Sequence, residues 1–187
     1  MNATKKKVLE ILLPAFRHNR SIVYIAGAAD SRILALLSYC YDCCDEFGKI
    51  YLDEKSGAAA LLLLPHQKSN SVKAILRDFK FVIKILSWGR IKRVIKREKD
   101  LKKLYPEKAF YHLWYVGVLP AMQQNGSGTR LLNQIIKEAQ SNQLPVYLET
   151  SEQRNFKWYE LNGFVLQHTF TIGGDDGYIL QAYKKPV

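Results

Sequence analysis

The sequence has few cysteines, and all of them lie close together. Cys40, Cys43 and Cys44 occupy the segment SYCYDCCDEF, and the four histidines of the chain are scattered. An odd number of neighbouring thiols makes a poor disulfide framework, and a zinc site needs more ligands than this segment supplies. We therefore expect no metal site and interpret the three cysteines as small apolar residues on one helix. Reduced thiols are typical of a cytoplasmic protein, which is the location we expect.

Long hydrophobic runs are also absent. No window approaches the ~20 apolar residues of a membrane-spanning helix, so no membrane span is predicted. The apolar start of the chain is interrupted by Glu10, and no signal-type cleavage site follows it. Hydrophobic residues nevertheless make up 48% of the chain, which excludes global disorder. A length of 187 residues predicts one domain spanning residues 1–187.

Acidic residues are outnumbered, and the formal charge is +11. Such a balance attracts polyanions, namely nucleic acid, an anionic membrane, acidic proteins or a phosphorylated cofactor, and does not choose among them. Residues 90–103 gather many of the basic side chains on one predicted helix. No zinc finger, helix-turn-helix or RNA-binding aromatic motif accompanies it, so a solvated outer face is favoured over a nucleic-acid interface.

Hydrophobic periodicity divides the chain into alternating helices and strands. Apolar spacing of three and four predicts helices, the second capped by Asp30 and Ser31, the third interrupted at Gly89 and stopped at Pro106. Runs of β-branched, aromatic and aliphatic residues predict strands. The helices are expected at 8–18, 30–44, 71–105, 127–141 and 154–161, and the strands at 49–53, 58–64, 110–118 and 145–151, with a hairpin at 163–185. This order predicts an α/β (α+β) fold in which helices cover a mixed sheet containing one parallel β-α-β unit.

The loop between the strand at 110–118 and the helix at 127–141 has the composition of a phosphate-binding turn. Gly126 and Gly128 allow the backbone to approach a ligand closely, and the first helical turn offers unpaired N–H groups. Arg130 can add positive charge. A P-loop is excluded because Gly-Lys-Ser/Thr is missing, and a dinucleotide fingerprint is excluded because its third glycine is missing.

Three motifs in register make the segment 112–164 resemble the GNAT superfamily of acyl-CoA N-acyltransferases. They are the V-x-P strand end Val118-Leu119-Pro120, the loop QQNGSG at 123–128, and the later motif formed by Asn155, the triplet WYE at 158–160 and the pair GF at 163–164. The string LETSEQRNFKWYELNGF is similar to the branch containing antibiotic-modifying acetyltransferases of the puromycin type. The first hundred residues match only in their pattern of elements. The resemblance implies a mostly antiparallel sheet in which the parallel strands at 110–118 and 145–151 splay apart to bind CoA.

The resemblance also implies a site and a co-substrate, acetyl-CoA. Pantetheine would bond to the backbone between the splayed strands, an amide beside Val118 would polarise the thioester carbonyl, and the pyrophosphate would sit on the glycine-rich loop. Tyr159 would protonate the departing thiolate. Asn155 would contact the cofactor arm or cap the short helix. The expected cofactor-binding residues are Val116, Gly117, Val118, Gln123, Gln124, Asn125, Gly126, Ser127, Gly128, Thr129, Asn155 and Tyr159.

The expected reaction is direct attack by a primary amine, with no covalent enzyme intermediate. His112 and Glu149 are both candidate bases, since they lie on adjacent strands near the splay. Residues 90–103 would shape the acceptor pocket, and Arg93 and Arg97 suggest an acceptor that bears a carboxylate or phosphate. An inactive acyl-CoA sensor and a basic nucleic-acid-binding adaptor stay open as alternatives, although the intact glycines and Tyr159 favour an enzyme. The expected partners are acetyl-CoA and an amine acceptor; nucleic acid is disfavoured and a homodimer is left open.

Overall fold

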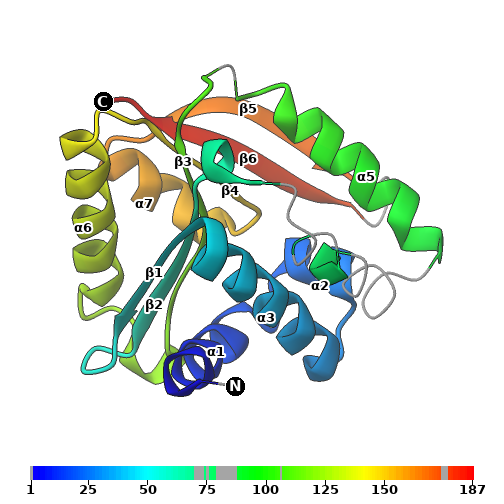
Figure 1. Ribbon diagram of the computed structural model, residues 1–187, viewed down its shortest axis with the longest axis horizontal. Helices are drawn as coiled ribbons and strands as arrows, with labels where there is room; N and C mark the ends of the chain where they lie inside the picture. Colours follow the sequence, from blue (N-terminus) through cyan, green and yellow to red (C-terminus); the bar gives the residue numbers. More distant parts are fainter. Residues whose placement is uncertain (1, 70–73, 75, 79–87, 106, 174–176) are drawn as a thin grey trace.

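A single six-stranded sheet organises the part of the chain that the computed structural model describes, namely residues 2–69, 74, 76–78, 88–105, 107–173 and 177–187, with only the backbone described at 88–93 (Figure 1). The strand order is β1-β2-β3-β4-β6-β5, and every neighbouring pair is antiparallel except β3 and β4. The strands are β1 Gly48–Asp53, β2 Ala58–Leu63, β3 Tyr111–Val118, β4 Val146–Thr150, β5 Val165–Ile172 and β6 Tyr178–Lys185. The predicted mixed, mostly antiparallel α/β fold is confirmed.

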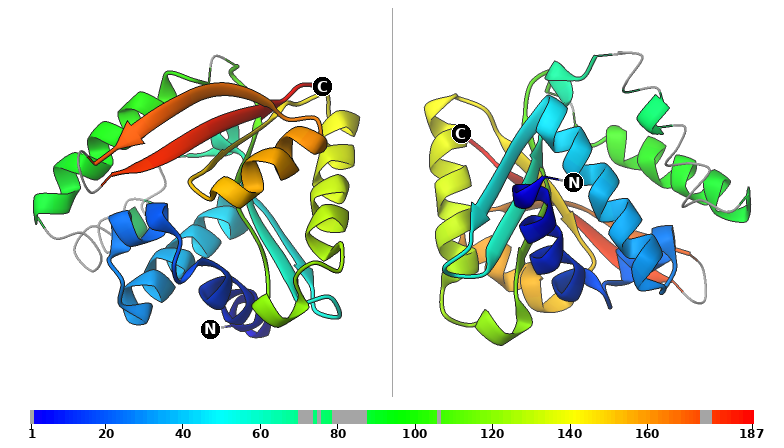
Figure 2. Two further views of the ribbon diagram at one scale, coloured as in Figure 1. Left: turned by 180° about the vertical axis from the view of Figure 1, so that it is seen from behind. Right: turned by 60° about the horizontal axis from the view of Figure 1, so that its bottom comes forward.

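Helices cover both faces of this sheet, as Figures 1 and 2 show. On β2, Ala59, Leu61 and Leu63 pack against α1 to α3, whereas the alternate residues pack against α6. All six β2 residues are buried, as a two-sided apolar strand requires. Helix α5 lies instead along the β5–β6 hairpin, where Leu101 packs on Tyr178 and Leu180. The helices are α1 Ala3–Phe16, α2 Arg20–Ala26, α3 Asp30–Phe47, α5 Trp88–Lys102, α6 Ser127–Ser141 and α7 Phe156–Leu161.

A β-bulge in β3 changes which side chains face which layer. Leu61 pairs with Tyr115 and Leu62 with Leu113, so Trp114 is the extra residue on the bulged strand. Leu113 packs on the α6 side, whereas Tyr115 packs on the side of α1 and α3. Without the extra residue, Leu113 and Tyr115 would share a face, because side chains alternate with a period of two. The bulge therefore places the side chain of Tyr115 in the layer formed by α1 and α3.

Several predicted boundaries need correction. The predicted cap by Asp30 and Ser31 is wrong, because Ala29 is the N-cap, no side chain caps α3, and Asp30 pairs with Arg17 at 2.6 Å. Gly89, where a break was predicted, is the second residue of α5, and the residues directly before α5 are not described, so the break stays a prediction. Helix α2 was not predicted. Most of the predicted helix before Gly89, and Pro106, lie outside the described residues.

The three cysteines are free and buried in the core on α3, as the amphipathic interpretation predicts. Burial raises the pKa of each thiol. Within the described ranges, no single helix is long and apolar enough to cross a bilayer; α2 and α3 together meet the criterion, but they bend by 96° at their junction. The one-domain organisation and the cytoplasmic location stay predictions.

Candidate active site

The parallel strands β3 and β4 separate soon after they meet. They pair only at Tyr111 with Val146 and at His112 with Tyr147, after which no register is shared. The backbone of β3 from Trp114 onward therefore has no strand partner on the β4 side. A cavity of about 1110 Å³ is lined by residues of both strands along this gap. Every residue predicted from the sequence to catalyse or to bind the cofactor lines this one cavity.

The glycine-rich loop forms one end of the cavity. Gln124 and Gly126 both have left-handed backbones, with φ of 65° and 79°, and Gly126 is the N-cap of α6. The Asn125 side chain accepts from the Ser127 amide at 3.0 Å, and Arg130 folds back to donate to the Asn125 carbonyl at 3.1 Å. These bonds fix the loop and occupy the Ser127 amide, while the next first-turn amides of α6, at Gly128 and Thr129, remain available because a helix cannot pair them internally. The loop thus presents N–H donors, a helix dipole and a cation together.

The packing of the protein itself does not require a glycine at position 128. A Cβ there would lie 3.5 Å from Val118 and 3.7 Å from Trp158, which is ordinary van der Waals contact. At Gly117 the reason is internal, because a Cβ would come within 3.0 Å of Leu12. The missing Cβ at Gly128 lets a ligand come close to the backbone of the loop.

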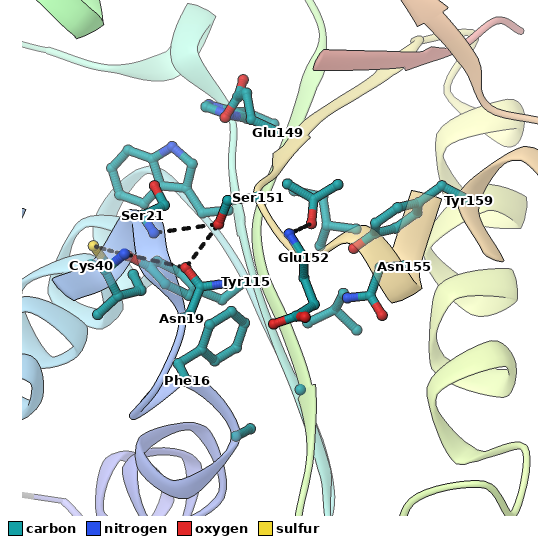
Figure 3. A pocket seen from close by; sticks show the side chains of 18 of the residues that line it. Phe16, Asn19, Ser21, Cys40, Tyr115, Glu149, Ser151, Glu152, Asn155 and Tyr159 are labelled. Carbon is teal, nitrogen blue, oxygen red and sulfur yellow. Dashed lines mark hydrogen bonds and ion pairs between the residues drawn. The ribbon is translucent and has the colours of Figure 1, made fainter. Parts of the chain in front are cut away.

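Tyr159 reaches the cavity from α7. Its ring is fixed between Trp158 and Phe164, at centroid distances of 4.7 and 5.6 Å. Within the described part of the chain its hydroxyl forms no hydrogen bond, and Figure 3 shows the hydroxyl directed toward Glu152 on the gap side. Burial raises the pKa of Tyr159, so the phenol keeps its proton and can serve as a donor.

Asn155 is the residue whose role the sequence left open between cofactor contact and helix capping. It occupies the N-cap position of α7, but its side chain makes no capping hydrogen bond. The side chain is half-buried and lines the cavity, close to Tyr159 in Figure 3. Helix α7 is instead tied to α6 by a bond of 3.0 Å from the Trp158 indole to the Thr129 hydroxyl.

His112 and Glu149 form a buried pair across β3 and β4. Nε2 of His112 lies 3.1 Å from Oε2 of Glu149, and neither side chain keeps more than 11% of its surface exposed. Burial lowers the pKa of His112 to about 3, and nearby Arg97 lowers it further. Burial raises the pKa of Glu149 to about 8, against the lowering effect of Arg97. At neutral pH both groups are therefore uncharged, and the Glu149 carboxyl donates to the imidazole.

The other half of the cavity is built by the N-terminal helices, and the sequence did not identify its residues. Figure 3 places Phe16, Asn19, Ser21 and Tyr115 together on this side of the gap, away from Tyr159. Phe16 and Tyr115 meet edge to face at 5.2 Å. Ser151, just after β4, accepts from the Ser21 amide at 3.3 Å and so joins the two halves.

Arg97 of α5 also lines this half, although a solvated position was favoured for the basic helix. Its side chain keeps only 10% of its surface exposed, whereas Ile95 on the same helix is 60% exposed. The helix therefore turns an arginine inward. Alternation of charged and apolar residues along 90–103 did not distinguish the two faces; only the position of α5 on the hairpin does.

Comparison with known proteins decides what this arrangement is. Residues 93–164 match the model of the acetyltransferase (GNAT) family. This segment of the chain is therefore similar to the GNAT acetyltransferases. The match covers α5, β3, the glycine-rich loop, α6, β4 and α7, which supply most of the cavity described above. It makes the chain an acyltransferase, and acetyl-CoA is the co-substrate of this family.

Solved structures described as acetyltransferases share the whole fold. A protein described as histone acetyltransferase HPA2 and related acetyltransferase, from Corynebacterium glutamicum, aligns with a TM-score of 0.68 at 19% identity, over 100% of this chain and 92% of its own. Arylalkylamine N-acetyltransferase 2 from Aedes aegypti aligns with a TM-score of 0.61 at 10% identity, over 97% and 95%. The polyamine N-acetyltransferase of Drosophila melanogaster, described as forming N-acetylagmatine, aligns with a TM-score of 0.55 at 12% identity, over 96% and 95%. At these identities the likeness concerns the fold and not the acceptor.

The residues that line the cavity fit acetyl-CoA. Two first-turn amides at a fixed glycine-rich loop, the nearby Arg130 and an unpaired length of β3 backbone match a pyrophosphate joined to an extended amide chain. Within the described residues no three His, Cys, Asp or Glu side chains gather as metal ligands. The metal-free site and the homodimer stay predictions.

Proposed function

We propose that this acetyltransferase transfers the acetyl group of acetyl-CoA to the primary amine of a small molecule by direct attack. The observation that carries the proposal is that β3 and β4 separate after His112 and Tyr147. The gap between the two strands and the N-terminus of α6 line the same cavity. An extended pantetheine arm has two amides, and the unpaired β3 backbone offers complementary groups at Val116, Gly117 and Val118. The amides and Arg130 of the loop at 123–129 would hold the pyrophosphate.

Tyr159 is proposed as the general acid. A thiolate leaving a tetrahedral intermediate needs a proton, and a buried phenol whose pKa is raised holds its proton at every physiological pH. Its hydroxyl is not engaged elsewhere in the described chain, so it can bond to the sulfur without breaking an internal hydrogen bond. Asn155, with no capping bond to make, would contact the cofactor arm.

Glu149 and His112 are proposed to act together as the base. Oε1 of Glu149 is buried without a hydrogen-bond partner in the structure, whereas Oε2 faces the imidazole. Once the pair has lost its shared proton, the carboxylate can accept one from the incoming amine through Oε1. Burial raises the pKa of Glu149 to about 8, so the carboxylate form becomes available at mildly alkaline pH.

The acceptor is proposed to be small because side chains of the surrounding helices and strands enclose the half of the cavity in which it would bind. Helices α1 and α3 contribute the aromatic side chains of Phe16 and Tyr39 to the wall of this half, and β3 contributes that of Tyr115. The segment 148–164 supports placement in the puromycin-acetyltransferase-like branch, whose acceptors carry an amine. A cytoplasmic enzyme would meet both substrates in solution.

A thiol-release assay with acetyl-CoA and a library of primary amines tests this function. We expect turnover that depends on both substrates and shows no burst of free thiol before the amine is added. Tight acetyl-CoA binding by calorimetry, with no turnover of any amine, would instead support the sensor alternative. The nucleic-acid adaptor predicts binding to DNA or RNA that weakens steeply with salt.

A further inference from the structure

The acceptor half of the cavity contains a buried cation that the proposed reaction does not use. Arg97 reaches it from α5 with a side chain that is nine-tenths buried. Nη1 pairs with Glu98 at 2.5 Å, and Nη2 donates weakly to the Ser21 hydroxyl at 3.3 Å. Nε is buried and has no hydrogen-bond partner in the structure. A guanidinium N–H in this state is costly unless a ligand occupies it.

The surrounding anions neutralise Arg97 only in part. Glu98, its only ion-pair partner in the described chain, also lines the cavity but keeps 52% of its side-chain surface exposed, so solvent screens its charge more than that of the buried guanidinium. Glu149 is close enough to feel the guanidinium charge, but burial keeps its carboxyl protonated at neutral pH. Two other cations of the cavity, Lys68 and Arg154, lie next to carboxylates of their own, at 3.9 and 3.6 Å. The unpaired Nε edge of Arg97 is therefore the part of this wall that is left to receive an anion.

We propose that the acceptor is an amino acid-like molecule whose carboxylate binds Arg97 and Ser21, while its amine faces Glu149 and the thioester. This inference rests on the proposed function and adds the substrate class. A carboxylate can accept from the free Nε and from Nη2 side by side, which is the planar fork that guanidinium groups offer. The Ser21 hydroxyl, already beside Nη2, would complete the pocket.

The amine and the carboxylate of the acceptor would then lie as far apart as the two protein sites that bind them, which are the Glu149–His112 pair and Arg97. Arg97 influences the pKa of both His112 and Glu149, so the anion site and the proposed base lie in one electrostatic neighbourhood. A zwitterionic acceptor fits this arrangement, since its carboxylate meets the cation and its ammonium meets the pair that takes its proton. A plain amine would leave Arg97 Nε unpaired and would bring a second positive charge close to it.

A purely structural Arg97 is the rival explanation. Its contact with Ser21 links α5 to α2, so removing it would lower stability whatever the acceptor. The two explanations differ in whether the loss depends on the acceptor's carboxylate.

The test uses pairs of acceptors that differ only in that group: phenylalanine with 2-phenylethylamine, leucine with 3-methylbutylamine, and β-alanine with ethylamine. Thiol release from acetyl-CoA gives kcat/KM for each. For the wild type, we expect at least one amino acid to exceed its decarboxylated partner tenfold or more. Arg97→Gln should lower kcat/KM for that amino acid roughly 10-fold to 100-fold, and for the amine less than threefold. Arg97→Lys should fall between, because it keeps the charge and loses the fork.

The possible results distinguish the carboxylate-binding role of Arg97 from the proposed N-acetyltransferase activity. Turnover of amines with no carboxylate preference in the wild type would overturn the inference and leave N-acetylation standing. Equal losses for acid and amine in Arg97→Gln would also overturn it in favour of the structural role. No turnover of any acceptor would remove both. Acetyl-CoA affinity by calorimetry and thermal melting check that each variant is folded, and if Arg97→Gln is not, the wild-type preference and Arg97→Lys decide.

Discussion

Replacing Tyr159 by phenylalanine removes one oxygen and tests the proposed acid directly. The ring would keep its contacts with Trp158 and Phe164, and the hydroxyl forms no hydrogen bond in the described structure. No internal bond is lost, so we expect the free energy of unfolding to change by less than about 0.5 kcal/mol. General acid catalysis contributes typically ~10²- to 10⁴-fold, so kcat should fall by that factor while KM changes little. The corresponding rise in the activation barrier is about 3–5 kcal/mol.

Tyr183→Phe is the matched control. This tyrosine lies 6.0 Å from the ring of Tyr159 and is fully buried, but its hydroxyl donates to Gln181 at 2.5 Å and approaches Glu160 at 3.3 Å. Losing these bonds should cost about 1 kcal/mol of stability, which lowers Tm by roughly 2–4 °C for a chain of this size. Its kcat should stay near that of the wild type.

Steady-state thiol release and thermal melting on both variants complete the experiment. The expected pattern is opposite in the two proteins: lost rate with kept stability for Tyr159→Phe, and lost stability with kept rate for Tyr183→Phe. If Tyr159→Phe retained kcat within twofold of the wild type, the acid role of Tyr159 would be wrong. A large loss of stability in the same variant would show instead that its hydroxyl has a structural partner.

Other predictions address the loop, the proton acceptor and the thiols. Gly128→Val should abolish acetyl-CoA binding in calorimetry without unfolding the protein. The control variant Gln134→Val, on the exposed face of the same helix, should bind acetyl-CoA normally. Normal affinity of Gly128→Val would refute the assignment of this loop as the phosphate-binding loop. Measured kcat/KM should rise with pH through about 8, the value to which burial raises the pKa of Glu149, and a flat profile would exclude that base. Chemical unfolding should show that the free energy of unfolding falls between about pH 6.5 and 8, because the Glu149 carboxyl holds a proton in the native protein that it has released in the unfolded chain. Below about pH 6.5 the lowered pKa of His112 acts in the opposite direction. The Glu149→Gln variant should lose the fall between about pH 6.5 and 8. Cys44, buried and with a raised pKa, should react with a thiol reagent only in denaturant, and fast labelling of the native protein would contradict its burial.

Local sequence signals were strongest where one element determines its own structure. The bounds of α6 were predicted to the residue, because the loop glycines and five apolar residues at helical spacing agree on where it begins and which face is buried. The turn at 54–57 and the two strands beside it follow from the same kind of short-range pattern. Boundaries failed where the signal was weak. The cap predicted at Asp30 and Ser31 failed, because Asp30 pairs with Arg17 and no side chain caps α3.

The spacing of residues within 112–164 predicted the strand, loop and helix segments that carry the glycine loop, Tyr159 and Asn155, which are the residues proposed to bind and to act on the cofactor. Tertiary structure decided the half of the cavity proposed for the acceptor. The bulge at Trp114 turns Tyr115 toward α1, and the seating of α5 on the hairpin buries Arg97 while exposing Ile95. Both depend on contacts between segments far apart in the chain, and no local periodicity encodes which face such contacts will cover.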